Sequence, residues 1–95
     1  MLNKSIFNIH QWCRYIGISL RTAQRIRKNN SRFTTLQSDR ILMLHELTRL
    51  GINLLGSKED FLEWLIKESP DYLVPRHTLL TTSFGIEIVR RELVG

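Results

Sequence analysis

Apolar residues recur at three- and four-residue steps along much of the chain, which is the spacing of one face of an α-helix. The longest such stretch runs from Leu36 to about Leu55. Its apolar positions are Leu36, Met43, Leu44, Leu47, Leu50, Leu54 and Leu55. Ile41 and Leu42 add a second apolar face, so we expect a central helix that is buried on two sides.

Residues before this helix carry the signals of two shorter helices. The predicted elements are a helix over 9–16, a helix over 20–28 and a linker over 29–35, whose sequence NNSRFTT is rich in turn formers. Asn8 is an N-cap residue with Gln11 three positions later, and Gly17 ends the first helix. Ser19 caps the second helix, which stops at Asn29.

The second half of the chain predicts a helix after Ser57 and a last helix over 86–93, with a break at residues 69–71. The inward positions of these helices are Phe61, Leu62, Leu65, Ile66, Ile86, Val89 and Leu93. Residues 73–84 (LVPRHTLLTTSF) suit either a strand or a short helix. A lone strand has no partner in this chain, so we favour a short helix, which Gly85 separates from the last one. The predicted fold is all-α, with five or six helices.

The composition is that of a small globular protein. The chain has 95 residues, of which 42% are hydrophobic and 24% charged. This is enough for one small domain, or for two half-domains that share a core. A single cysteine excludes an internal disulfide and fits a reducing compartment. With no secretory signal and no apolar run of about 20 residues, we expect a cytoplasmic protein without a membrane segment. Its small size and two-faced apolar helix predict a homodimer.

Charge is distributed unevenly along the chain. Residues 1–45 contain eight basic residues and one acidic residue, a net charge of +7. Residues 46–95 contain six basic and eight acidic residues, a net charge of −2. This asymmetry predicts that one surface meets a polyanion while the other meets a different partner. A merely solvated basic face is the alternative interpretation.

Residues 9–28 fit a helix-turn-helix unit. Cys13 supplies a small residue where the helices cross, Gly17 supplies the turn, and Ala23 and Ile26 supply apolar anchors on the second helix. The outer face of that helix carries donors suited to base edges and phosphates. These candidate DNA-binding residues are Ser19, Arg21, Thr22, Gln24, Arg25 and Lys28, with Arg32 beside them near the phosphates. Arginine bonds guanine through two donors, and glutamine pairs with adenine in the same way.

Three pieces of the chain, in this order, resemble the Xre/MbcA/ParS antitoxins of type II toxin–antitoxin systems. They are GISLRTAQRIRKN, SDRILMLHELTRLGINLLGSKEDFLEWL and LLTTSFGIEIVRREL. The middle piece combines a long helix, a glycine and an aromatic residue followed by Trp64-Leu65. The last piece is similar to the family pattern at Leu79, Leu80, Thr82, Gly85 and Val89. The resemblance covers residues 9–93.

The resemblance implies an antitoxin with two regions. Residues 1–34 would form a helix-turn-helix that binds double-stranded operator DNA and represses the operon. Residues 35–95 would form a helical domain that binds and neutralises a toxin, either a RES-type enzyme that consumes NAD or an ADP-ribosyltransferase. We place Tyr72, Arg76, Arg90 and Arg91 against that toxin, and we expect Arg90, Arg91 and Glu92 to project from the last helix. The antitoxin itself would need no cofactor.

No set of residues predicts catalysis. His10 and Cys13 have a metal-ligand spacing but no further ligands nearby, and Glu63 is expected to pair with Lys67 rather than to act as an acid. The threonines near residue 80 lack a base. We therefore expect a protein that is not an enzyme and binds no metal. Two alternatives stay open: a small repressor without a toxin, and a pure protein-interaction module.

Overall fold

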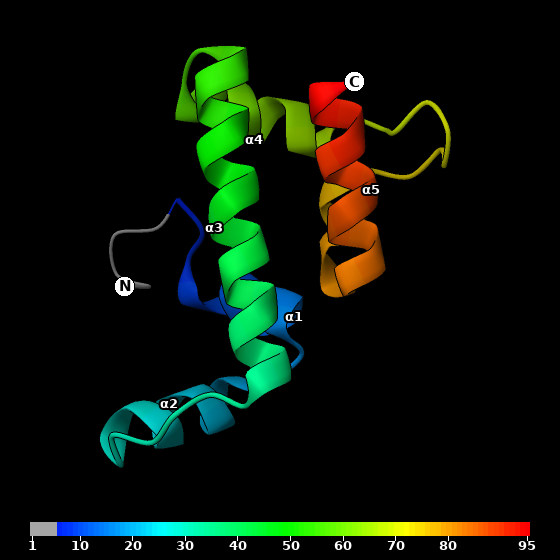
Figure 1. The fold of residues 1–95 in the computed structure, drawn as a ribbon. Coiled ribbons are helices and arrows are strands. Elements are labelled where there is room, and N and C mark those ends of the chain that lie inside the picture. Colours follow the sequence, from blue (N-terminus) through cyan, green and yellow to red (C-terminus); the bar gives the residue numbers. More distant parts are fainter. Residues whose placement is uncertain (1–5) are drawn as a thin grey trace.

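The computed structural model describes residues 6–95, and its regular structure consists of helices joined by short connections (Figure 1). In chain order the elements are α1 (Ile9–Ile16), α2 (Leu20–Lys28), α3 (Thr35–Leu55), α4 (Lys58–Ile66), the 3-10 helix η2 (Arg76–Thr81) and α5 (Ser83–Val94). Within residues 6–95 the only strand-like pairing is an isolated antiparallel bridge between Glu68 and Pro75. The predicted all-α fold is therefore confirmed. Residues 1–5, with which the predicted N-terminal region begins, lie outside the described residues.

The first two helices begin and end where their cap residues predict. The Asn8 side chain accepts a hydrogen bond from the Gln11 N–H at 2.9 Å, and the Gln11 side chain accepts one from the Asn8 N–H at 2.8 Å. α1 ends at Gly17, whose φ of +87° is left-handed and favours glycine. The Ser19 hydroxyl accepts from the Thr22 N–H at 3.0 Å and caps α2. A three-residue connection therefore joins α1 to α2.

α3 is the longest helix, and it packs against α1, α4 and α5. α5 runs beside it, while α2 lies at the opposite end of the molecule from the α3–α4 turn (Figure 1). Thr34 and Gln37 form a reciprocal capping box at its start, and Gly56 ends it with a φ of +103°. Its 21 residues span about 31 Å, most of the 41 Å long axis of the molecule.

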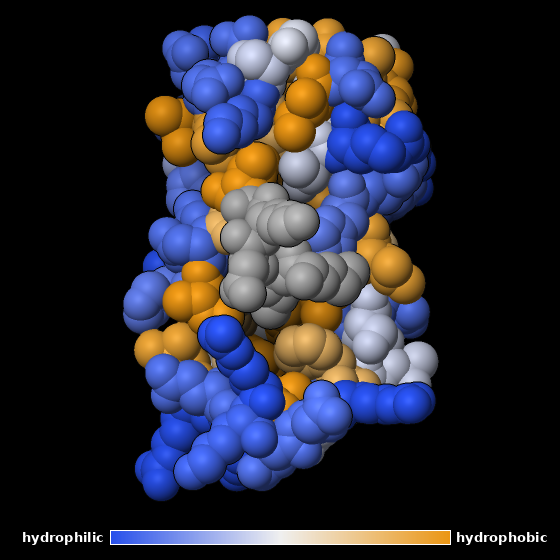
Figure 2. Space-filling model, turned by 90° about the vertical axis from the view of Figure 1, so that its left-hand side faces the viewer, coloured by the Kyte–Doolittle hydropathy of each residue, from blue (hydrophilic) through white to orange (hydrophobic). Residues whose placement is uncertain are grey.

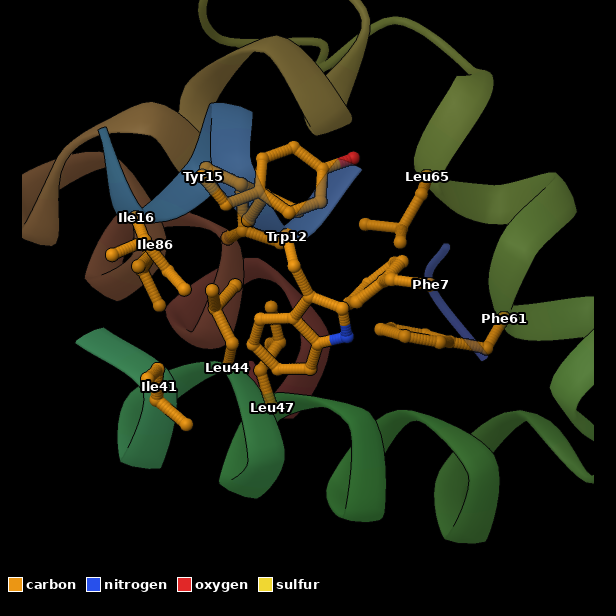
Figure 3. Close-up of a cluster of buried hydrophobic side chains, with 12 residues drawn as sticks. Phe7, Trp12, Tyr15, Ile16, Ile41, Leu44, Leu47, Phe61, Leu65 and Ile86 are labelled. Atoms are coloured by element: carbon orange, nitrogen blue, oxygen red, sulfur yellow. The ribbon is translucent and has the colours of Figure 1, made fainter. Parts of the chain in front are cut away.

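The apolar core is built from both halves of the chain. Trp12, from α1, is 1% exposed and lies among Leu44 and Leu47 of α3, with Phe7 edge-on to its ring at 5.7 Å (Figure 3). The core residues are Phe7, Trp12, Tyr15, Ile16, Ile41, Leu44, Leu47, Phe61, Leu65, Leu80, Ile86 and Val89. The predicted regions 1–34 and 35–95 therefore share one core, which a cut at their boundary would divide.

Four apolar residues that the pattern assigns to the interior lie at the surface instead. Leu36, Leu42 and Leu54 of α3 are 64%, 61% and 56% exposed, and Ile66 of α4 is 65% exposed. The prediction of a helix buried on two sides is wrong at Leu42, although Ile41 beside it is buried. Periodicity reports which positions share a helix face, but it does not report how much of that face a neighbour covers.

The segment before α5 forms a short helix, as favoured, but its boundary is not at Gly85. The Thr82 hydroxyl accepts a hydrogen bond from the Gly85 N–H at 2.9 Å, so α5 begins at Ser83 and contains this glycine in its first turn. A Cβ atom at Gly85 would lie 1.8 Å from the carbonyl oxygen of Leu79. Glycine is needed here because η2 and α5 approach closely, not because the helix is interrupted.

Replacing Gly85 with Ala should destabilise the protein, which reverses the usual effect of this change in a helix. Alanine normally stabilises a helix interior by about 1 kcal/mol relative to glycine. Here the methyl group meets the backbone of Leu79, so we expect the free energy of unfolding to fall by about 1–3 kcal/mol. Urea denaturation followed by circular dichroism measures the change.

The matched control is Ser83→Ala in the same helical turn, which should change the free energy of unfolding by less than about 0.5 kcal/mol. A Gly85→Ala variant as stable as the wild type would contradict the close approach of η2 to α5.

Candidate functional site

α2 is a basic helix that projects its side chains into solvent. It contains four cationic residues and no acidic residue, and none of its residues is buried. It lies at the lower end of the molecule, where the surface is strongly hydrophilic (Figure 2). Ala23 and Ile26, the predicted apolar anchors, are half-buried.

One face of α2 gathers most of the predicted DNA-binding side chains. Arg21, Gln24, Arg25 and Lys28 are all exposed, and helical spacing places them within an arc of about 100°. Arg27 is also exposed, but it lies about 120° around the helix from Arg21. We call the first four residues the α2 outer face.

Within residues 6–95 the cations of α2 make no ion pair. The ion pairs of this part of the chain all lie in its second half, among residues of α3, α4, η2 and α5 and the cap residue Lys67. Four positive charges without acidic partners repel one another, which costs stability. A bound polyanion would relieve this repulsion. The α2 outer face is therefore electrostatically prepared for an anionic partner.

The remaining predicted DNA-binding residues, Ser19, Thr22 and Arg32, differ in whether their polar groups already form hydrogen bonds within the protein. The Ser19 hydroxyl donates to the Thr22 hydroxyl at 2.9 Å, in addition to its capping bond, so both hydroxyls already serve the start of α2. Arg32 is exposed on the linker before α3. The sequence predicts Ser19 and Thr22 on the outer face of the helix, whereas in the structure their hydroxyls bond each other at its start.

Arg40 fixes the turn from which α2 departs. Its Nη1 atom donates to the Ile16 carbonyl oxygen at 3.1 Å, which satisfies a free carbonyl at the end of α1. Because Arg40 belongs to α3, this bond ties the α1–α2 connection to the central helix. The sequence pattern did not identify this role, since Arg40 lies 24 positions from its partner.

Two predicted toxin-binding residues lie together near the C-terminus. Tyr72 and Arg91 line one groove between the loop after α4 and the outer side of α5. The complete lining of this C-terminal groove is Asp71, Tyr72, Ile88, Arg91, Glu92 and Gly95. Leu73 follows directly, 72% exposed and with a left-handed φ of +58°.

Arg90 faces a different groove, between α3 and α5. Its Nε and Nη2 atoms donate to Glu87 at 2.9 and 2.6 Å, which lowers the pKa of the Glu87 carboxyl. This α3–α5 groove is lined by Leu42, Met43, Glu46, Ile86, Glu87 and Arg90. Arg91 projects from α5 as expected, with its side chain 69% exposed, and Arg90 is 40% exposed; both pair with Glu87, and they line different grooves.

Arg76 and Glu92 form a cluster inside the molecule. Arg76 Nε lies 3.4 Å from Glu92 Oε1, and the two side chains are only 11% and 12% exposed. Arg76 Nη1 donates to the Trp64 carbonyl at 3.0 Å, and its guanidinium lies 4.3 Å from the centre of the indole ring. The fully buried Ser69 hydroxyl donates to Glu92 at 2.8 Å. The projection expected for Glu92 is therefore wrong, and Arg76 has an internal role that places it away from an open surface.

The described residues bring together no set of groups typical of catalysis or metal binding. Within residues 6–95 no three His, Cys, Asp or Glu side chains lie close enough to hold a metal ion. Cys13 is buried, which raises the pKa of its thiol and makes it less reactive. The expected pair of Glu63 and Lys67 is present at 3.9 Å. No helix in this part of the chain is long and apolar enough to cross a membrane.

No protein-family model matches the chain, and the search of curated proteins gives no match. The resemblance to Xre/MbcA/ParS antitoxins therefore stays a prediction from the residues quoted above.

Removing the cation of the internal cluster should destabilise the protein far more than removing an exposed one. Arg76→Met leaves Glu92 partly buried without its counter-charge, so we expect the free energy of unfolding to fall by about 3 kcal/mol. Arg49→Met is the control, because its pair with Glu46 is more than half exposed and solvent screens it, so its loss should change the free energy of unfolding far less. Chemical denaturation of both variants measures the change in the free energy of unfolding. Equal decreases for the two variants would refute a structural role for Arg76.

Proposed function

We propose that this chain is a DNA-binding antitoxin: α2 would bind operator DNA, and the C-terminal groove would bind a partner toxin. The observation that carries the proposal is the α2 outer face, an exposed array of three cations and one amide with no acidic partner within residues 6–95. The toxin half rests on the resemblance of the sequence to Xre/MbcA/ParS antitoxins, which suggests a RES-type or ADP-ribosyltransferase toxin.

The DNA-binding step follows from the size and chemistry of α2. An α-helix fits the major groove of B-DNA, where each base pair presents its own pattern of donors and acceptors. Arg21 and Arg25 would donate to guanine, and Gln24 would pair with adenine. Lys28, together with Arg32 on the linker, would contact phosphates and fix the register. Arg40 would hold α2 at its angle by bonding the end of α1.

The C-terminal groove supports a protein partner through its residue types. Tyrosine and arginine are enriched among the residues that carry most of the binding energy at interfaces, and both Tyr72 and Arg91 line this groove. The exposed side chain of Leu73 adds apolar surface beside them. Binding of the toxin here would leave α2 open, so that one chain neutralises the toxin and represses the operon.

Two other functions predict different behaviour. A repressor without a toxin would bind DNA but would not rescue growth when the product of the neighbouring gene is expressed. A pure protein-interaction module would show no DNA affinity that depends strongly on salt. The DNA-binding experiment below separates a pure protein-interaction module from the antitoxin and the repressor. The growth-rescue experiment then separates an antitoxin from a simple repressor.

Arg25→Ala should weaken sequence-specific DNA binding, whereas Lys28→Ala should weaken binding to every duplex. With a duplex selected from a random pool, we expect Arg25→Ala to cost about 1–3 kcal/mol and to relax selectivity at one base pair. Lys28→Ala should reduce the slope of log affinity against log salt by about one unit. Fluorescence anisotropy on the selected and on a random duplex measures both effects.

Arg27→Ala is the matched control, because it removes the same charge from the same helix at a position off the outer face. It should leave base selectivity unchanged. Equal losses for Arg25→Ala on selected and random DNA would show that Arg25 reads no base.

Arg90 and Arg91 line different grooves, so one of them can be used to test toxin binding and the other as its control. Arg91→Glu reverses a charge in the C-terminal groove beside Tyr72, so it should weaken toxin binding at least about tenfold and reduce growth rescue. Arg90→Glu makes the same change one residue earlier, on the α3–α5 side, and should leave rescue intact. Co-expression of full-length variants with the product of the neighbouring gene measures the difference, and full rescue by Arg91→Glu would exclude the groove.

A further inference from the structure

A groove of about 310 Å³ lies between α1 and α4, and it shares no residue with the α2 outer face or the C-terminal groove. Its α1 side is polar. Gln11, Arg14 and Tyr15 line it, and their three- and four-residue spacing places them on one face of α1. His77, from η2, adds an imidazole ring. We call this cavity the α1–α4 groove.

The α4 side of the groove is apolar. Leu62, Leu65 and Ile66 line it with the same helical spacing, and Phe7 adds an aromatic ring. Leu65 is buried, whereas Ile66 is 65% exposed. Apolar walls with a few placed polar groups are the usual composition of a small-molecule site, and the volume lies at the small end of the range for such sites.

Tyr15 brings a polar group without a partner to this groove. Its hydroxyl forms no hydrogen bond within residues 6–95, although the residue is only 2% exposed. The ring packs edge-on against Phe7 at 5.2 Å, and the hydroxyl points away from Trp12, on the side of Leu65 (Figure 3). Buried polar groups normally have a hydrogen-bond partner. A ligand in the groove would supply the one that Tyr15 lacks.

The charge of the groove is positive. Arg14 is exposed and makes no ion pair within residues 6–95. Burial raises the pKa of the Tyr15 hydroxyl and the Arg14 charge lowers it, so these two groups lie close enough to act on one ligand. The Gln11 side-chain oxygen already accepts from the Asn8 N–H, which leaves its amide N–H groups as donors. No acidic residue lines the groove.

We infer that the α1–α4 groove binds a small monocarboxylate with a compact apolar body, of the size of an arylacetate. The carboxylate accepts hydrogen bonds from Arg14 and from the Tyr15 hydroxyl, because the planar guanidinium matches a carboxylate through two parallel bonds. The apolar body covers the α4 side, including the exposed Ile66. A single arginine balances one negative charge, so a phosphate dianion would keep an excess charge beside apolar walls.

The size of the groove limits the affinity. A ligand of about ten non-hydrogen atoms fills a site at the small end of the range, so we expect a dissociation constant on the order of 0.1–1 mM. Binding requires neither DNA nor a toxin, because every contact comes from α1, α4, η2 and Phe7.

NMR titration of the full chain tests the proposal, with phenylacetate added to about 20 mM at constant ionic strength. We expect saturable shifts of the backbone amides of Gln11, Arg14 and His77. Benzyl alcohol keeps the ring without the charge, whereas acetate keeps the charge without the ring. Each of these, and inorganic phosphate, should bind at least about tenfold more weakly than phenylacetate.

Two variants identify the groups that hold the carboxylate. Arg14→Gln removes the charge and should weaken phenylacetate binding at least about tenfold. Tyr15→Phe keeps the ring and removes only the hydroxyl, and it should weaken binding at least about threefold. Arg27→Gln is the control, because it removes the same charge from an exposed position on α2, and it should change the dissociation constant by less than about twofold.

Four results would overturn the proposal: no saturable shift with phenylacetate, equally tight binding of benzyl alcohol or phosphate, equal weakening by Arg14→Gln and Arg27→Gln, or an unchanged dissociation constant in Tyr15→Phe. The dispersion of the amide spectrum reports whether each variant is folded. Because the assay contains only this chain and a small molecule, a failure of DNA or toxin binding has no bearing on its outcome.

Discussion

The buried pair of Arg76 and Glu92 holds together the part of the molecule that has the least regular structure. Between α4 and η2 the chain forms a loop closed by backbone hydrogen bonds, among them those from the Ser69 N–H to the Val74 carbonyl and from the Arg76 N–H to the Lys67 carbonyl. Glu92 anchors this loop by accepting from the Ser69 hydroxyl while facing Arg76. Arg76 in turn bonds the end of α4 through the Trp64 carbonyl. Three elements thus converge on one carboxylate, and the position of the C-terminal groove depends on them. Such a pair is costly to break because either charge would be left without its counterpart.

The opposite end of the molecule is organised in a different way. α2 has no buried side chain, and its position depends on the α1–α2 connection, on Arg40 and on the half-buried Ala23 and Ile26. Unpaired like charges on a lightly packed helix reduce stability, and natural proteins retain such features mainly where they serve binding. The Trp12 side chain offsets this loss of stability, because it anchors α1, the helix before α2, in the shared core.

Local chemistry was predictable from the sequence, whereas tertiary contacts were not. Asn8, Gly17 and Ser19 mark helix boundaries because their effects act within a few residues, and the structure has those boundaries. The prediction that Gly85 separates two helices was wrong. Glycine is needed there because the Leu79 carbonyl of η2 lies too close for a Cβ atom, and no local sequence pattern reveals that contact. The internal role of Glu92 was missed for the same reason, since its partners lie 16 and 23 residues away. At the candidate site, helical periodicity was enough to predict that the α2 outer face is exposed. It could not predict that Arg90 and Arg91 line different grooves, because these grooves are formed with α3 and with the loop after α4.

The length of α3 has a consequence for how the two ends of the molecule influence each other. Its span of about 31 Å is roughly three to four times the Debye length at physiological ionic strength, which is about 8 Å. Mobile ions therefore screen the basic end from the groove at the other end, and neither surface changes the potential felt at the other. Any communication between them has to pass as mechanical strain through the shared packing of α1, α3 and α5, and salt would leave it largely unchanged.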